Sequence, residues 1–302
     1  MTSPMTSADI TAVFEARRRH LFGLAYRILG SRADAEDAVQ DTFIKWQATD
    51  HEAIDTPAAW LTTLCTRHCI DMLRDAQRSR VDYIGTWLPE PIQTRTDDTP
   101  ETHALLASSL GTAFLLLLER LTPKERAAYL LREIFDTPYA EVASTLGMEE
   151  AACRKLVSRA QASVAQARVR HVTPPKVQDG LLSAFRDAIT GGGTGALAGL
   201  LADDIALCAD SGGKVSSIEG VIHGKASVLA LIAEKLAGYW ANYDWVPCEI
   251  NGGRAIQLRA KDGETIAAIT FAYNALGQAS NIFIMRNPDK LDGLAFGPEA
   301  VA

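Results

Sequence analysis

The chain has 302 residues, of which 47% are hydrophobic and 22% charged, and its formal net charge is −7 at pH 7. This length allows two domains or three small ones, and the acidic balance argues against a protein that binds nucleic acid through bulk positive charge alone. The longest apolar run, residues 113–118, is far shorter than the ~20 residues of a membrane span, and the N-terminus lacks the basic-then-apolar order of a signal peptide.

Residues 9–81 have a helical pattern with two differently charged helices. Ser31 and Asp34 predict a helix start, after which small and apolar residues recur at helical spacing and predict one buried face. The opposite face carries acidic and polar side chains, namely Asp34, Glu36, Asp37, Gln40 and Asp41. A charged face is often only a solvated face.

The next helix starts at Pro57 and gathers arginines in its second half. These are Arg67, Arg74, Arg78 and Arg80. Acids on one helix and arginines on a later one indicate two different partners rather than solubility alone. Cys65, His68 and Cys69 share this helix, but a closed zinc site needs further ligands, so we predict inward-packing cysteines with no metal and no cofactor. Five scattered cysteines also favour a reducing cytoplasm over a disulfide framework.

Residues 82–103 break the helical pattern with several prolines, and residues 104–171 are helical again. Within the latter, a short helix starting after Thr137, a turn at Gly147 and a second helix predict a helix-turn-helix. The outward side of the second helix carries Arg154, Lys155, Ser158 and Arg159. Such residues suit guanine edges and phosphates in a major groove, although an ordinary helical hairpin has the same pattern.

The character of the chain changes after Pro175. Residues 178–291 combine one long helix with Gly-rich turns and short alternating runs near 255–258, 265–271 and 280–285, which is typical of an α+β domain. The expected fold is therefore multidomain, with two all-α domains followed by an α+β domain.

Three groups of motifs resemble a known family. The stretches SRADAEDAVQDTFIKW (31–46) and PAAWLTTLCTRHCIDMLR (57–74) together resemble region 2 of bacterial extracytoplasmic-function sigma factors. The stretch LERLTPKERAAYLLREIFDTPYAEVASTLGMEEAACRKLVSRAQ (118–161) resembles region 4 of the same proteins. The motifs TWLPEP (86–91), DSGGK (210–214) and NPDK (287–290) resemble those of the sigma-J-like group, which carries a C-terminal SnoaL-like extension of the NTF2-like cone fold. Ser211 and the Asn251-Gly252-Gly253 loop depart from the group pattern.

The resemblance implies a sigma factor that binds core RNA polymerase and promoter DNA and has no enzymatic activity. The acidic face described above would meet the clamp helices of the polymerase β′ subunit, and region 4 would meet the β flap. The arginines of the helix starting at Pro57 would approach the −10 element, and the outward residues of the second helix of the helix-turn-helix would read the −35 element. The linker around Trp87 would thread towards the active-site channel of the polymerase.

For the extension we expect regulation in cis, because a covalently joined domain contacts its neighbours at high effective concentration. It would hold regions 2 and 4 in a compact arrangement through interdomain residues, namely Trp87, Pro89, Asp210, Gly212, Gly213, Lys214, Asn287, Pro288, Asp289 and Lys290. A small-molecule ligand in a pocket at the mouth of the cone is a further candidate partner. That pocket would be lined by Asp210, Lys214, His223, Tyr239, Trp240, Tyr243, Trp245 and Asn251.

Two alternatives remain open at this point. One is a standalone helix-turn-helix regulator that senses a small molecule through the C-terminal pocket. It predicts DNA affinity without polymerase, falling steeply with salt. The other is a SnoaL-type enzyme fused to a DNA-binding module, but the sequence offers no complete set of general base and oxyanion donors.

Overall fold

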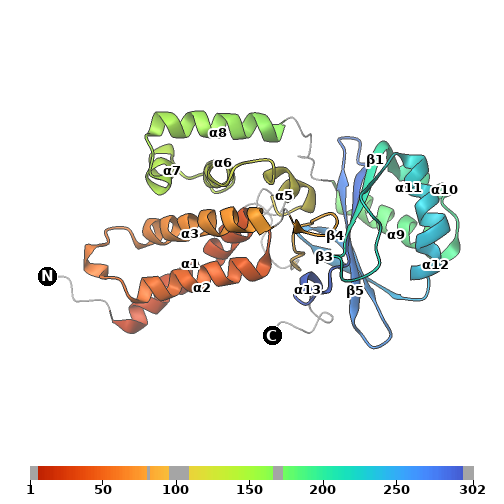
Figure 1. Cartoon of the computed structure of the whole chain (residues 1–302), viewed down its shortest axis with the longest axis horizontal. Helices are drawn as coiled ribbons and strands as arrows, with labels where there is room; N and C mark the ends of the chain where they lie inside the picture. Colours follow the sequence, from red (N-terminus) through yellow and green to blue (C-terminus); the bar gives the residue numbers. More distant parts are fainter. Residues whose placement is uncertain (1–5, 80–81, 95–108, 166–172, 295–302) are drawn as a thin grey trace. The chain divides into compact units, whose positions relative to one another are not determined.

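The computed structural model describes residues 6–79, 82–94, 109–165 and 173–294. The chain divides into two compact units. The first unit combines residues 1–81 with 117–167, and the second combines residues 82–116 with 168–302. The first is all helical and the second is built on a sheet (Figure 1). The described part of the predicted linker therefore clusters with the C-terminal domain rather than with either helical region.

The first half of the first unit consists of α1 (Ser7–Leu29), α2 (Arg32–Gln47), the 3-10 turn η1 (His51–Ala53) and α3 (Pro57–Ser79). Ser31 starts α2 as predicted, since its Oγ accepts from the Asp34 N–H at 3.1 Å. The three α-helices pack on one another around Trp46, which is fully buried and donates its Nε1–H to the Ile10 carbonyl at 2.8 Å. The buried stripe of α2 leaves its acidic side exposed.

The second half begins at the end of α5 (Thr112–Leu118), whose residues 112–116 belong to the second unit. It continues with α6 (Pro123–Tyr129), the π-helical turn η3 (Leu130–Ile134), α7 (Tyr139–Leu146) and α8 (Glu150–Ala165). Thr122 and Glu125 form a reciprocal capping box at the start of α6. Gly147 ends α7 with φ of 62°, a left-handed conformation that glycine adopts without strain. The structure thus contains the predicted sequence of short helix, glycine turn and second helix.

The second unit contains a six-stranded sheet in the order β2-β1-β6-β5-β4-β3. The strands are β1 (Leu201–Asp210), β2 (Val221–His223), β3 (Asp244–Ile250), β4 (Gly253–Arg259), β5 (Thr265–Tyr273) and β6 (Ala279–Met285). Only the β1–β6 pair is parallel. The helical elements are α9 (Pro175–Gly191), α10 (Gly195–Leu200), α11 (Lys225–Leu231), η4 (Ile232–Leu236), α12 (Ala237–Trp240) and α13 (Pro288–Leu291). The strands at 255–258, 265–271 and 280–285 are confirmed.

The two faces of this sheet have different coverings. Because side chains alternate along a strand, Leu207 and Ala209 of β1 join a core with Phe185 of α9, whereas Cys208 points to the opposite face. That opposite face holds a second apolar cluster with Leu88 of the linker. The linker thus occupies the side of the sheet that α9 leaves open. No helix in the described ranges is long and apolar enough to cross a bilayer.

Candidate functional site

The acidic face of α2 is exposed as a stripe. Asp37 and Gln40 are exposed, and Ile44, one turn further along, is 54% exposed. Two of the predicted acids have partners within the unit. Glu36 pairs with Arg32 at 2.8 Å, and Asp41 lies 3.0 Å from the His68 Nε2 on α3. The sequence analysis missed Ile44, although its i+7 spacing from Asp37 places it on the same stripe.

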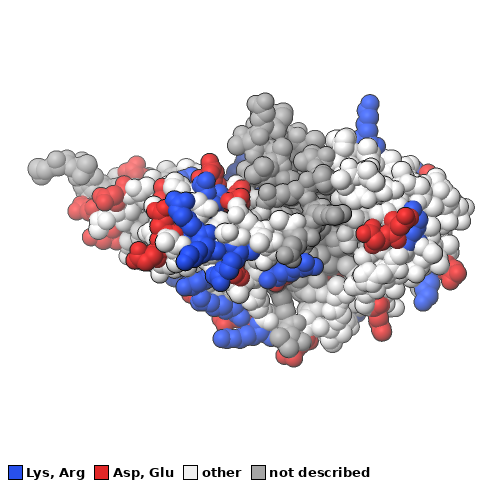
Figure 2. All heavy atoms as spheres, turned by 90° about the horizontal axis from the view of Figure 1, so that it is seen from above, with Lys and Arg blue, Asp and Glu red and all other residues white. Residues whose placement is uncertain are grey.

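The arginines predicted to approach the −10 element have unequal surroundings. Arg74 and Arg78 form exposed ion pairs along their own helix, with Asp71 at 2.6 Å and with Asp75 at 3.3 Å. Arg67 instead donates to two backbone carbonyls of α7. Arg80 lies outside the described residues. Figure 2, which looks down on the side where α8 lies in Figure 1, shows Lys and Arg side chains gathered there.

The second helix of the helix-turn-helix, α8, exposes all four predicted residues. Arg154 is held in place, because Glu150 accepts from its Nη2 at 2.5 Å and its guanidinium lies 4.3 Å from the centroid of the Tyr139 ring. Lys155 and Arg159 show no ion pair with a described side chain. The outward side of α8 therefore combines one fixed and two adaptable cations.

A buried carboxylate joins the linker to the C-terminal domain. Asp210, the last residue of β1, is fully buried. Its Oδ1 accepts from the Tyr83 hydroxyl at 2.5 Å and from the Gly212 N–H at 3.0 Å. Its Oδ2 accepts from the Leu88 N–H and from the Lys290 ammonium, both at 2.8 Å. We call Asp210, Lys290 and the linker residues bound to them the linker clamp.

Lys290 of α13 closes the linker clamp from the other side. Besides Asp210, its Nζ donates to the Leu88 carbonyl at 2.7 Å. The ammonium also lies 4.6 Å from the Trp87 ring centroid and 4.9 Å from that of Tyr83. Burial, together with the hydrogen bond to Asp210, raises the pKa of the Tyr83 hydroxyl, so this hydroxyl remains a donor at neutral pH. One buried ion pair thus binds both backbone and rings of the linker.

The glycines of the DSGGK motif let the linker approach closely. A Cβ built on Gly213 would lie 2.9 Å from the Ile84 Cγ2, closer than carbon atoms pack. A Cβ on Gly212 would lie 2.5 Å from the Asn287 Nδ2. Asn287 in turn donates to the Tyr83 hydroxyl at 2.9 Å. The first residues of the NPDK motif and the DSGGK motif therefore meet the same linker tyrosine.

The outer ends of these two motifs are joined by an ion pair between Lys214 and Asp289, both about half exposed. Pro288 is the first residue of α13, and the Asn287 side chain caps that helix by accepting from the Asp289 N–H at 3.2 Å. These residues therefore shape the two loops that carry the linker clamp.

The end of the linker pairs with the β3–β4 turn. The Ile92 N–H donates to the Asn251 Oδ1 at 2.8 Å, and the Asn251 N–H donates back to the Ile92 carbonyl at 2.9 Å. The Thr94 N–H donates to the Glu249 carbonyl at 3.0 Å. Pro89 and Pro91 are buried between these contacts and the linker clamp. The linker is thereby held at Tyr83 and Leu88 and again at Ile92 and Thr94, with residues 88–91 buried between.

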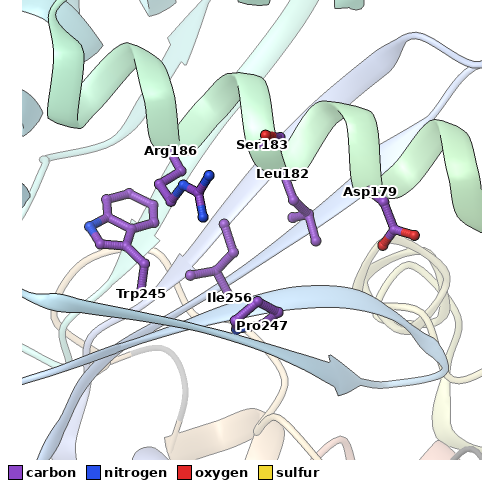
Figure 3. A pocket seen from close by; sticks show the side chains of 7 residues that line it. All are labelled: Asp179, Leu182, Ser183, Arg186, Trp245, Pro247 and Ile256. Atoms are coloured by element: carbon purple, nitrogen blue, oxygen red, sulfur yellow. The ribbon is translucent and has the colours of Figure 1, made fainter.

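The predicted ligand pocket needs correction. Asp210 and Asn251 face the linker, and Trp240 is buried in the core of the cone. A cavity of about 180 Å3 lies instead between α9, β3 and β4 (Figure 3). Among the eight predicted residues, only Trp245 lines it, and its other lining residues are Asp179, Leu182, Ser183, Arg186, Pro247 and Ile256. That a small molecule binds there stays a prediction.

The cysteines of α3 point inward, as predicted. Cys65 and Cys69 are fully buried with their sulfur atoms 4.0 Å apart, while His68 faces Asp41. Besides Ile44, the sequence did not mark two residues that join distant segments. Tyr83 lies in the linker clamp, 127 positions from its partner Asp210. Arg126 of α6 is 1% exposed and binds the Ile28 carbonyl of α1. Neither carries a local sequence signal for these contacts.

Comparison with known proteins gives a consistent result. Residues 13–79 match the family Sigma-70 region 2, and residues 112–162 match Sigma-70, region 4. The chain is 35% identical to the ECF RNA polymerase sigma factor SigJ of Mycobacterium tuberculosis, over 93% of this chain and 92% of that protein. It is 26% identical to the probable ECF RNA polymerase sigma factor SigI of the same organism, over 94% and 96%. The crystal structure of SigJ superposes with a TM-score of 0.74 at 32% identity, covering 95% of this chain and 100% of that one.

Proposed function

Since the chain belongs to the extracytoplasmic-function family of RNA polymerase sigma factors, we propose that its C-terminal domain controls promoter-directed transcription in cis by holding the linker between the two helical regions. As a sigma factor, the protein directs core RNA polymerase to specific promoters. The single observation that carries the regulatory part is the buried carboxylate of Asp210, which binds the Tyr83 hydroxyl and the Leu88 N–H where the linker enters its buried stretch, residues 88–91. We place its action in the cytoplasm, where the polymerase works, and assign it no catalysis.

The helical regions divide the work of initiation. The exposed stripe of α2, which includes Asp37, Gln40 and Ile44, would dock on the β′ clamp helices. Acids around an apolar side chain suit such a contact, because the charges speed and orient docking while the apolar group gains from burial. Region 4 would bind the β flap and present α8 to the −35 element. The arginines of α3 would meet the −10 element.

Control in cis follows from competition for one segment. In a holoenzyme the linker would enter the polymerase, but on the C-terminal domain Leu88 is 1% exposed and its backbone N–H and carbonyl are both bonded. One chain segment does not serve both sites at once. The domain is covalently attached, so it competes at high effective concentration and restrains holoenzyme formation.

The matched test uses two glycines with similar backbone angles. Gly213 has φ of 72° and lies against Ile84, whereas Gly220 has φ of 69° and nothing within 4 Å of an added Cβ. Both substitutions to alanine carry the same kind of backbone strain, but only Gly213→Ala pushes on the linker.

The assay is transcription in vitro with purified core polymerase and the upstream region of the protein's own gene as template, and transcript should require this protein. At limiting factor, Gly213→Ala should exceed wild type several-fold and Gly220→Ala should not. Equal output from both variants would contradict linker control.

Neutralising the acidic stripe should weaken polymerase binding. Asp37→Asn is expected to lower the affinity for core polymerase roughly two- to tenfold at low salt, mainly through slower association, because long-range attraction steers docking. Surface plasmon resonance with immobilised core enzyme at two salt concentrations measures this. Glu15→Gln on α1 is the control, since Glu15 is an exposed acid outside the stripe. An equal effect of both variants would remove the assignment of α2.

Arg159→Ala should weaken promoter recognition without affecting polymerase binding. If Arg159 reads a base, the loss is about 1–3 kcal/mol and is confined to promoters with the preferred base. If it contacts phosphate, the loss is uniform across promoters and the salt slope falls by about one. Transcription from a set of −35 variants by reconstituted holoenzyme separates the two. Unchanged transcription from every template would exclude Arg159 from the DNA interface.

A further inference from the structure

Regions 2 and 4 pack directly against each other within the first unit, through α3 and α7. The Arg67 Nε of α3 donates to the Thr145 carbonyl at 2.7 Å, and its Nη2 donates to the Ser144 carbonyl at 2.9 Å. Beside it, the hydroxyls of Thr63 and Thr145 lie 3.0 Å apart. A helix predicted to meet the −10 element is therefore bonded to the helix-turn-helix that would read the −35 element.

The end of α7 is a favourable site for a guanidinium. The last carbonyls of a helix lack partners within it and carry the negative end of the helix dipole. Two neighbouring carbonyls here match the two N–H groups of the Arg67 fork, which makes the hydrogen bonds charge-assisted. The Arg67 side chain is nevertheless still exposed. It is bound, but it remains within reach of another partner.

A second set of contacts joins the two regions at α1. The Phe135 ring, which follows η3, has its centroid 4.9 Å from that of His20 and 5.5 Å from the Arg27 guanidinium carbon. Arg126 of region 4 donates to the Ile28 carbonyl at 2.7 Å. Each region thus contributes an arginine to the C-terminal turn of a helix in the other region.

We infer that Arg67 is an autoinhibitory latch, because its guanidinium binds the end of α7 in the free protein and a promoter phosphate in the open complex, and does not bind both at once. The second half of this statement rests on the proposed sigma function. Promoter elements centred near −35 and −10 lie about 25 base pairs apart, or roughly 80 Å along B-form DNA. Two helices in hydrogen-bond contact do not span that distance, so the latch opens before both elements are read.

A latch of this kind lowers the apparent affinity for polymerase. If only the open form binds core enzyme, the observed dissociation constant is the intrinsic constant divided by the open fraction. Removing one latch contact without touching a DNA-binding side chain should therefore tighten binding. Thr63→Val with Thr145→Val is such a change, because valine keeps the shape of threonine and removes the hydroxyl.

The test measures the separation of the two regions in the full-length free protein. Spin labels at Gln47→Cys and Gln161→Cys, both exposed, report the α2–α8 distance by double electron–electron resonance. Cys248→Ala provides the background, because Cys248 is the free cysteine that is not fully buried. The proteins compared are wild type, Arg67→Ala, the double valine variant, and Arg74→Ala as a control, because Arg74 of α3 pairs with Asp71 on its own helix.

The latch predicts a short, narrow distance distribution in wild type and Arg74→Ala, and a longer, broader one in Arg67→Ala and in the double valine variant. The double valine variant should also bind core polymerase roughly threefold more tightly. Unchanged distances in both latch variants would overturn the inference. Because the distance measurement involves neither polymerase nor promoter, failure of the sigma function would appear only in the binding assay.

Discussion

Replacing Asp210 by alanine is expected to lower the unfolding temperature of the second unit by about 10 °C and to release the linker. The substitution leaves the Lys290 ammonium, 14% exposed, without its carboxylate and the Tyr83 hydroxyl and Leu88 N–H without their acceptor. Removing one member of a buried ion pair costs about 3–5 kcal/mol, and for a unit of this size each kcal/mol corresponds to about 2–4 °C.

Calorimetry of the full chain measures the change in unfolding temperature, and chymotrypsin measures linker release. Tyr83, Trp87 and Leu88 are cleavage sites that the wild-type linker clamp covers, so nicking there should appear only in Asp210→Ala. The control is Asp203→Ala on the same strand as Asp210. It removes an exposed carboxylate that pairs with Lys225 at 2.7 Å. It should behave like wild type. Resistance of Asp210→Ala to nicking would show that the linker is held by other contacts.

Arg126→Ala is expected to destabilise the first unit by about 3–5 kcal/mol. Arg126 is 1% exposed, and its guanidinium binds the Leu118 carbonyl at 3.0 Å, the Ile28 carbonyl at 2.7 Å and the Glu119 carboxylate at 2.7 Å. Truncation leaves these acceptors buried together with a cavity the size of an arginine side chain. Charged side chains are almost never buried to this extent unless they are paired.

Urea unfolding followed by far-ultraviolet circular dichroism gives the free energy of unfolding of the first unit, since this unit is all helical and loses its helical signal when it unfolds. Arg18→Ala is the comparison, because Arg18 of the same unit lies at the surface beside Glu15 and should contribute little. Arg126→Lys should fall between the two, as an ammonium reaches fewer of the three acceptors. A loss no larger than that of Arg18→Ala would mean that the buried guanidinium is dispensable.

Local signals predicted the elements of the fold well. Ser31 begins a helix where expected, and Gly147 turns the chain where a left-handed residue is needed. Alternation in the C-terminal half predicted three of the six strands, β4, β5 and β6, but not β1, β2 or β3. These signals act over three or four residues, so the sequence displays both partners together.

The placement of site residues was harder, because it depends on contacts between distant segments. Asp210 was predicted both in a regulatory motif and in a pocket, and only the pairing of β1 with β6, where Asp210 lies opposite Met285, fixes the face it occupies. A shift by one residue would turn it into the cone. Tyr83 and Arg126 likewise meet partners 127 and 98 positions away. No local pattern marks either residue, and Arg126 by itself resembles a surface arginine.

The central claim is that binding of core polymerase draws the linker off the C-terminal domain, and hydrogen exchange of the full chain tests it most directly. In the free protein the Asn251 N–H is bonded to the Ile92 carbonyl and the Gly252 N–H to the Thr94 hydroxyl, so a peptide covering 249–253 should exchange slowly. Adding core polymerase should speed exchange in that peptide, while a peptide from the centre of β6 stays protected. Undiminished protection of 249–253 in a verified complex with core polymerase would contradict the account.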